Sequence, residues 1–399
     1  MKTTVSCYLA LEFLWRLVTA LHFTIYAIFL RDRGLDLFEA NLVNAIYFIA
    51  VALFEVPTGI VADVFGRKVS FMLAIGFYGS GLLIYSKANS FSGCVAGEVL
   101  AALGLTFQSG AFDAWMVDEL KSYGSGDDYI KLIFSRRSQL EYLGSILGGL
   151  LGAYLGLRDI ALPWLISAVA IFMLAPITLL WMREEHFTPI VKNIGNVLKE
   201  MVRTGIYGVR YVRSKSSVHL VIIFAAFLFF GVMAPNMQWQ IYFGRFYGSV
   251  SGNGWVWCGI GIALFCGARF IPGLTLRYFG GKTDLVLILI LVACGIGIAA
   301  TPLSSVLSLS LIIFWMQQFF RGGINPLKDA YLNEQIDDKT IRATVLSIES
   351  LVRHLAGVAG LVVSGLVARH ISLEAAWISS GAVMILGGLL LLWRKFKTT

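Results

Sequence analysis

The chain has 399 residues, of which 57% are hydrophobic and only 14% are charged, and its formal net charge is +8. A soluble protein of this length has no way to bury so much apolar surface, so the composition excludes that class and predicts an integral membrane protein. The five cysteines form no C-x-x-C pair, and we interpret them as small buried hydrophobic side chains.

Long apolar runs account for nearly the whole chain. A membrane-spanning helix needs about 20 mostly apolar residues, and twelve runs approach this length. The first run is too long for the core of a signal peptide, so we predict that it is retained as a helix. In chain order the predicted helices cover residues 4–30, 38–62, 69–87, 91–119, 129–156, 161–182, 216–243, 253–276, 285–301, 305–331, 341–368 and 372–393.

The basic residues are distributed unevenly between the two sides of this predicted topology. With both termini in the cytoplasm, 21 Lys and Arg residues fall on the cytoplasmic side and six on the outer side. This positive-inside bias predicts cytoplasmic termini. The same distribution indicates that the positive net charge reflects membrane topology and attraction to anionic lipid headgroups, and not nucleic-acid binding.

The chain divides into two similar halves. A basic, polar stretch at 183–215 separates a predicted domain at 1–182 from one at 216–399. Residues 107–119 (FQSGAFDAWMVDE) match residues 323–334 (GINPLKDAYLNE) at a spacing of about 216 residues. This internal similarity predicts two six-helix repeats joined by a cytoplasmic linker.

The turn between the second and third predicted helices carries the most specific motif. Gly59, Asp63, Gly66, Arg67 and Lys68 fit the pattern G-x-x-x-D-x-x-G-R-K/R. The motif resembles the signature loop between helices 2 and 3 of major facilitator superfamily transporters. The resemblance implies an all-α integral membrane protein with 12 transmembrane helices in two pseudo-symmetric six-helix bundles.

The same resemblance implies a mechanical role for this loop. Asp63 and Arg67 are expected to form charge pairs with each other and with the end of helix 11, at Arg342. These pairs would steady the outward-facing state and break as the two halves rock.

The fifth predicted helix carries closely spaced small residues. Gly144, Ser145, Gly148 and Gly149 resemble the G-P-x-x-G-G motif of superfamily antiporters, with serine in place of proline. Small residues allow helices to pack closely and to bend. This departure from the motif weakens the inference of antiport.

Several charges lie inside predicted helices, where each costs about 2.5–3.5 kcal/mol. Glu12 and Arg16 lie one turn apart, either as a self-neutralising pair or facing the central cavity. Asp113 and Glu141 are candidate proton carriers, although Asp113 is equally well explained by an ion pair that locks a helix interface. Arg137 is expected to contact lipid headgroups or helix ends.

Helix 4 departs from the family pattern. Glu98 stands in the region where the family often carries an arginine, so a proton relay built on that arginine does not transfer to this chain. Glu98 belongs either to a different relay or to the solvated outer surface.

Further polar residues are candidate contacts for the substrate. They are Gln108, Asn236, Gln238, Trp239 and Arg321. The structural alternative is a helix–helix contact for Gln108 and an interfacial aromatic belt for Asn236, Gln238 and Trp239. Arg321 could bind an anionic substrate or hold a carboxylate on a facing helix.

The sequence contains no P-loop, no G-x-S-x-G and no H-E-x-x-H, so we predict no enzymatic activity, cofactor or metal. The run from Phe54 to Ala111 looks like bacterial drug and metabolite efflux members of the superfamily. It predicts a monomeric, proton-coupled exporter of a small amphipathic compound in the bacterial cytoplasmic membrane. Two alternatives remain: a proton symporter or uniporter that imports a sugar, an organic acid or a siderophore-like metabolite, and a non-transporting receptor or scaffold.

Overall fold

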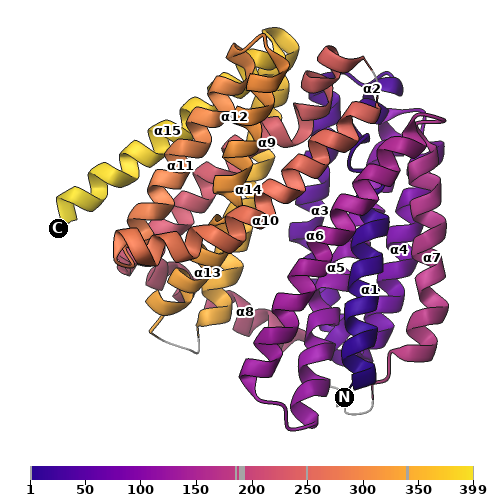
Figure 1. Cartoon of the computed structure of the whole chain (residues 1–399). Helices are drawn as coiled ribbons and strands as arrows, with labels where there is room; N and C mark the ends of the chain where they lie inside the picture. The colour runs from indigo at the N-terminus through magenta and orange to yellow at the C-terminus, as the bar shows by residue number, and fades with distance from the viewer. Residues whose placement is uncertain (1, 185–186, 188–193, 249, 338–340, 399) are drawn as a thin grey trace. The chain divides into compact units, whose positions relative to one another are not determined.

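The computed structural model describes the chain except for residues 1, 185–186, 188–193, 249, 338–340 and 399. Over the described residues it consists of helices and connecting turns, without a β-strand (Figure 1). The helices are α1 Lys2–Ala20, α2 Tyr26–Asp32, α3 Leu37–Phe65, α4 Arg67–Lys87, α5 Phe91–Ser122, α6 Asp127–Gly156, α7 Leu162–Trp181, α8 Ile194–Ser214, α9 Ser216–Tyr247, α10 Ser251–Phe279, α11 Thr283–Ala300, α12 Leu307–Gly322, α13 Ile324–Gln335, α14 Arg342–His370 and α15 Leu373–Thr398, with a 3-10 turn at Thr301–Leu303.

Nine of the described helical segments are long and apolar enough to cross a membrane. They lie in α3, α4, α5, α7, α9, α10, α11, α14 and α15, the segment of α11 extending to Leu303. The three other predicted spans differ from these in length or charge. Helix α12 has only 16 residues, and α1 and α6 carry most of the buried charges described below.

Two predicted helices are each broken into two. The first, predicted at 4–30, ends at Ala20, and the chain turns before α2 begins at Tyr26. The tenth, predicted at 305–331, divides at Gly323 into α12 and α13. At this break a Cβ atom on Gly322 would overlap the backbone of Leu264 in α10, so the close approach requires glycine.

The chain packs as two compact units. The first contains residues 1–191 and 240–261, and the second contains residues 192–239 and 262–399. In the first unit α4 packs against α5 and α7, α3 packs against α5, and α1 packs against α6. In the second unit α11 packs against α15 and α12, while α14 packs against α15 and α8. The last turns of α9 and the first part of α10 therefore belong to the first unit by packing.

Small residues bring α1 and α6 into close contact. Gly144, Gly148 and Gly152 follow one another at four-residue intervals along α6, which places them on one face. A Cβ atom on Gly144 would lie 2.9 Å from the carbonyl oxygen of Phe13, and those on Gly148 and Gly152 would overlap the carbonyl oxygens of Leu17 in α1 and of Leu21 just after it. This approach sets the side chains of the two helices opposite each other.

Candidate functional site: a charge cluster in the first unit

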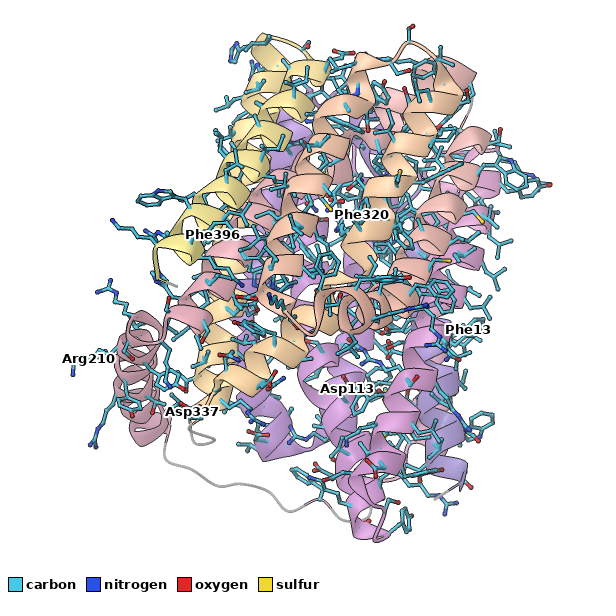
Figure 2. All side chains as sticks on the ribbon, turned by 60° about the vertical axis from the view of Figure 1, so that its left-hand side comes forward. Phe13, Asp113, Arg210, Phe320, Asp337 and Phe396 are labelled. Carbon is cyan, nitrogen blue, oxygen red and sulfur yellow. The ribbon has the colours of Figure 1, made fainter. Side chains whose placement is uncertain are left out.

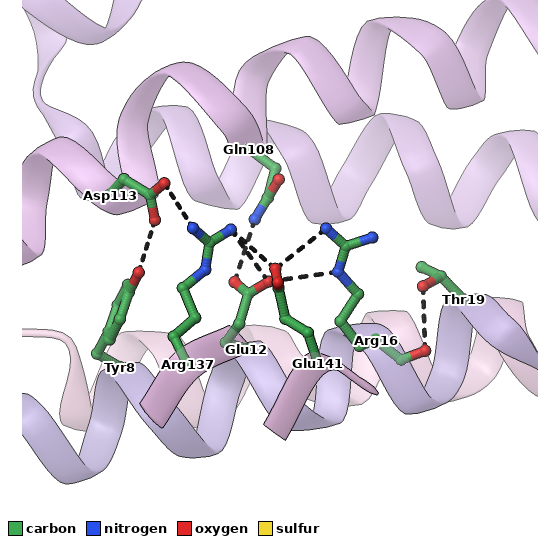
Figure 3. Close-up of polar contacts among 8 residues, drawn as sticks. All are labelled: Tyr8, Glu12, Arg16, Thr19, Gln108, Asp113, Arg137 and Glu141. Carbon is green, nitrogen blue, oxygen red and sulfur yellow. Dashed lines mark hydrogen bonds and ion pairs between the residues drawn. The ribbon is translucent and has the colours of Figure 1, made fainter. Parts of the chain in front are cut away.

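Helices α1, α5 and α6 bring five charged side chains together (Figure 3). Glu12 and Arg16 lie one turn apart on α1, and Arg137 and Glu141 lie one turn apart on α6. Asp113 of α5 completes the group, which we call the charge cluster. Four of these residues were predicted as candidates, namely Glu12, Arg16, Asp113 and Glu141, and the fold places them with Arg137.

Arg137 connects all three carboxylates. Its Nη1 lies 2.9 Å from Oδ2 of Asp113, and its Nη2 lies 2.9 Å from Oε1 of Glu141. The same Nη2 lies 3.5 Å from Oε1 of Glu12. The interpretation of Arg137 as a headgroup contact was wrong, because its position on α6 turns it toward α1 and α5. Its spacing from Glu141 was the signal that could have revealed this.

Arg16 binds the other side of the two glutamates. Its Nη2 donates to Oε1 of Glu141 at 3.1 Å, and its Nε lies 3.5 Å from Oε1 of Glu12. Glu12 and Glu141 thus share both guanidinium groups. The α1 pair is at once an i,i+4 pair and part of a wider network.

Neutral donors complete the cluster. The hydroxyl of Tyr8 donates to Oδ1 of Asp113 at 2.7 Å, and Nε2 of Gln108 donates to Oε2 of Glu12 at 3.5 Å. Tyr8 stacks on Phe112 with ring centroids 5.0 Å apart, which fixes the hydroxyl beside Asp113. Sequence reasoning missed Tyr8, because a tyrosine in an apolar helix carries no signal of its own.

Exposure varies across the cluster. Glu12 is fully buried, whereas the side chains of Asp113 and Arg16 are 37% and 42% exposed. The cluster therefore has a buried end at Glu12 and more accessible ends at Asp113 and Arg16.

The charges of the ionised cluster do not sum to zero. Three carboxylates face two guanidinium groups, so the fully ionised cluster carries one negative charge. An unbalanced charge is costly to bury in a membrane protein. One proton on a carboxyl group would make the cluster neutral.

A second buried carboxyl group lies in the same unit. Glu98 of α5 accepts hydrogen bonds from the hydroxyls of Tyr26 and Tyr85 at 2.9 and 2.5 Å, and from Nδ2 of Asn44 at 3.4 Å. Only 5% of Glu98 is exposed, and no basic side chain of the described chain lies within ion-pair distance. The alternative that Glu98 is solvated at the outer surface was therefore wrong.

The turn between α1 and α2 leaves backbone groups without helical partners. Gln240 satisfies two of them, since its Nε2 donates to the carbonyl of Phe23 at 2.6 Å and its Oε1 accepts from the amide of Ala27 at 2.7 Å. Nδ2 of Asn253 donates to the carbonyl of Thr24 at 3.0 Å. Sequence reasoning missed both amides, because it expected one continuous first helix.

The loop between α3 and α4 is held by an unexpected acid. Asp63 and Arg67 form the predicted pair at 2.8 Å. Gly66 has φ of 102°, a conformation that favours glycine. The amides of Arg67 and Lys68 donate to the carboxylate of Glu184 at 2.6 and 3.2 Å. Glu184, which follows α7, thus caps the N-terminus of α4.

The remaining loop candidates have separate surroundings. Lys68 donates from Nζ to the carbonyl of Leu179 at 2.8 Å, and Gly59 lies within α3. Arg342 begins α14 in the second unit and donates to the carbonyl of Asn333 at 3.5 Å. Its pairing with Asp63 stays a prediction.

Another part of the α6 motif receives an aromatic side chain. The indole nitrogen of Trp257 donates to the carbonyl of Ser145 at 2.9 Å, and its ring lies against Gly149. Glycine is required at 149, because a Cβ atom there would overlap the indole.

In the second unit two of the polar candidates bond to each other, and two others are buried. Arg321 donates from Nη1 to Oδ1 of Asn236 at 2.7 Å, so these two predicted residues meet. Gln238 is fully buried and accepts a hydrogen bond from the indole of Trp377 at 3.1 Å, and Trp239 is also buried. Gln238 thus contributes to helix packing.

The second unit also contains a buried ion pair. Nζ of Lys328 lies 2.8 Å from Oε1 of Glu349 and 3.1 Å from Oδ1 of Asp329. Asp329 is the repeat counterpart of Asp113, so each half places an acid–base contact at this position. Within the described chain, no group of three or more His, Cys, Asp and Glu side chains is arranged to hold a metal ion.

Comparison with known proteins identifies the family. Residues 9–293 match the family model of the Major Facilitator Superfamily. The chain belongs to this superfamily. It is 23% identical over 384 residues to YxaM of Bacillus subtilis (strain 168), an uncharacterized MFS-type transporter, covering 89% of this chain and 86% of YxaM.

Solved structures agree on the fold. The nucleoside transporter NupG superposes with a TM-score of 0.79 at 13% identity, covering 98% of both chains. A POT family transporter in complex with 5-aminolevulinic acid gives a TM-score of 0.76 at 13% identity, covering 99% of this chain and 96% of the other. These findings confirm the all-helical membrane fold and a multi-pass secondary transporter for small molecules, which is not an enzyme.

Proposed function

We propose that this superfamily member is a proton-coupled transporter whose charge cluster carries the coupling proton, and that it exports a small, amphipathic organic compound. The observation that carries the proposal is the imbalance of three carboxylates and two guanidinium groups around the fully buried Glu12.

The network offers a way for the proton to act on the helices. A proton on Glu12 or Glu141 weakens their contacts with Arg16 and Arg137, since a neutral carboxyl attracts a guanidinium less strongly. These contacts join α1 to α6. Loss of the proton restores them, so the two protonation states favour different packings of these helices.

The more exposed end of the cluster suits a substrate. First helices line the central cavity in this superfamily, and the side chain of Arg16 is 42% exposed. A substrate that engages Arg16 or Asp113 competes with their contacts inside the cluster. Proton and substrate then bind to linked groups, which is the requirement for coupling.

The direction of transport is argued from the α6 motif and from the similar folds. The small residues of α6, Gly144 to Gly149, resemble the antiporter motif and favour export. Import as a proton symporter is the second candidate, because the similar folds include a nucleoside transporter and a POT family transporter bound to 5-aminolevulinic acid. A receptor or scaffold without transport remains the third. We further propose a monomer in the bacterial cytoplasmic membrane with both termini in the cytoplasm, on the positive-inside bias.

Reconstitution into proteoliposomes that contain a pH-sensitive dye tests the proposal. A thermal-shift screen of metabolites and drugs first identifies a compound that stabilises the purified protein. A gradient of that compound should then drive proton movement, inward or outward according to whether the protein is a symporter or an antiporter.

The variant Glu12→Gln supplies the decisive comparison. It should still bind the compound but lose proton movement, whereas Asp128→Asn, an exposed ion pair partner at the start of α6, should behave as wild type. Substrate flux with normal proton coupling in Glu12→Gln would overturn the role of the cluster. If a gradient of the compound drives no proton movement in the wild type or in any variant, the receptor or scaffold is favoured.

A further inference from the structure

The carboxyl group of Glu98 is a buried titratable group that does not belong to the charge cluster. Asp113 of the cluster (Figure 2) lies about four turns further along the same helix, α5, which corresponds to about 22 Å along its axis. Glu98 lies about two turns after the first residue of α5, and its partner Tyr85 lies in the last turn of α4. Glu98 is therefore at the α4–α5 end of the first unit, separate from the charge cluster.

Four helices meet at this carboxyl group. Tyr26 at the start of α2, Asn44 of α3 and Tyr85 of α4 each donate a hydrogen bond to Glu98 of α5. The ring of Tyr85 stacks on the buried Trp164 of α7, with centroids 4.2 Å apart. Glu98 is thus surrounded by neutral donors and aromatic side chains.

The neighbouring titratable groups do not balance a charge on Glu98. Besides Tyr26 and Tyr85, the groups that its charge acts on are Tyr47, Tyr78 and Cys94. Tyrosine and cysteine side chains are ordinarily neutral near pH 7. None of these side chains therefore supplies a positive charge.

The nearest basic groups are engaged elsewhere. His22 stacks on Trp164, and Arg16 pairs with the glutamates of the charge cluster. In the part of the chain that the structure describes, neither lies within ion-pair distance of Glu98. The same holds for the other basic groups at this end of α2 and α4, and the acids at this end add no positive charge. These charged residues are Arg31, Asp32, Arg33, Asp36, Glu39 and Lys87.

The hydrogen-bonding atoms around Glu98 satisfy both protonation states of its carboxyl group. The ionised form accepts all three hydrogen bonds. In the protonated form Oε2 can donate to the hydroxyl of Tyr85 at 2.5 Å, and the hydroxyl of Tyr85 can donate to that of Tyr26 at 3.5 Å. Tyr26 still donates to Oε1 at 2.9 Å, which closes a ring of three hydrogen bonds. The neutral acid thus leaves no hydroxyl hydrogen of the ring without an acceptor.

We propose that Glu98 is a second proton-binding site, which carries its proton in this closed ring and loses it when water reaches the α4–α5 end. A carboxylate buried without a cation is so costly that such a group takes up a proton instead. The closed ring satisfies the neutral acid without water, whereas the anion requires water. Because the carboxyl group joins α2, α3, α4 and α5, its ionisation favours a hydrated, more open packing of these helix ends.

This inference rests on the proposed proton coupling and adds a second group to it. With both termini in the cytoplasm, as proposed, the α4–α5 end faces the outer side. Glu98 then exchanges its proton with the outer solution, at a distance from the charge cluster.

Infrared difference spectroscopy of the full-length protein in lipid bilayers, recorded between two pH values, tests the proposal. The carbonyl stretch of a protonated carboxyl group is separate from the bands of ionised carboxylates. We expect such a band in the wild type to decrease as the pH is raised. It should be absent from E98Q and shifted in Y85F, which lacks the acceptor for the acid proton. The control E55Q removes an exposed glutamate of α3 and should leave the band unchanged.

The variant E12Q distinguishes this inference from the role of the charge cluster. The band that E98Q removes should persist in E12Q. A pH-dependent band that E12Q removes and E98Q keeps would overturn the second site and leave the charge cluster in place. A band that E98Q removes but that does not change with pH would also overturn the proposal, because Glu98 would then be a permanently neutral structural acid. If E98Q loses the pH-dependent band while E12Q keeps its proton coupling, the second site stands and the role of the cluster fails.

Discussion

At the scale of single residues, the chain holds its intramembrane charges in two different ways. Arg137 connects three carboxylates, so the charge cluster depends on one guanidinium group. Glu98 instead lies among the neutral donors Tyr26, Tyr85 and Asn44. The two arrangements predict different responses to substitution.

Loss of Arg137 should destabilise the protein strongly. Arg137→Gln leaves Glu12 and Glu141 near each other with one cation fewer, and removing one partner of a buried ion pair costs about 3–5 kcal/mol. Thermal unfolding in detergent should show a clearly lower midpoint, whereas Arg136→Gln, the exposed neighbour, should show little change. Adding Glu12→Gln to Arg137→Gln should recover part of the loss. A midpoint for Arg137→Gln equal to that of Arg136→Gln would contradict the role of Arg137.

Glu98 should tolerate a neutral replacement. Glu98→Gln keeps an acceptor for the two tyrosine hydroxyls, so its unfolding midpoint should stay near wild type. Glu98→Ala leaves buried donors without a partner, at about 1–3 kcal/mol for each group, and should lower the midpoint. If Glu98→Gln is as unstable as Glu98→Ala, the site requires a carboxylate.

At the scale of elements, the contact between α1 and α6 determines where the charge cluster forms. Gly148 lies against Leu17 of α1, with no space for a Cβ atom. The resemblance to the antiporter motif pointed to these glycines, and the structure gives them a packing role that depends on α1. The side chains of Arg16 and Glu141 meet because the two backbones approach so closely.

Two glycine substitutions should have opposite effects. Gly148→Ala pushes α1 away from α6 and should lower the thermal midpoint and weaken proton coupling together. Gly76→Ala in α4, where a Cβ atom meets nothing within 4 Å, should instead raise stability by about 0.5–1 kcal/mol through helix propensity. Similar midpoints for the two variants would exclude the packing role of Gly148.

At the scale of the whole molecule, the superfamily fold implies that transport proceeds by alternating access. The loop at Gly66 is fixed within the first unit by the pair of Asp63 with Arg67 and by the cap from Glu184. Such exposed pairs contribute only about 0–1 kcal/mol each, yet a two-state equilibrium responds to biases of this size.

Asp63→Asn should therefore slow transport without affecting membrane insertion. Loss of up to about 1 kcal/mol corresponds to a change of up to about fivefold in rate. Counterflow of the identified substrate in proteoliposomes measures this rate, at equal amounts of inserted protein. Transport at the wild-type rate would show that the pair does not contribute to gating.

The sequence by itself determined the class of protein and its family. Apolar runs report membrane helices directly, because every backbone group in lipid must be satisfied within a helix. The loop motif lies within the short stretch from Gly59 to Lys68, so it can be recognised from the sequence without knowledge of the fold. The Glu12–Arg16 spacing also depends only on the helix repeat.

Only the tertiary structure decided which charges act together. Arg137 looked like a headgroup contact, and Glu98 was left open between a proton relay and the solvated surface, because sequence spacing does not reveal which helix faces another. Glu184 and Gln240 satisfy backbone groups far away in the chain, at a helix start and at a break that apolar periodicity does not show. Long-range contacts of this kind arise from the packing of helices, which in turn depends on glycines whose role appears only when the neighbouring backbone is in place.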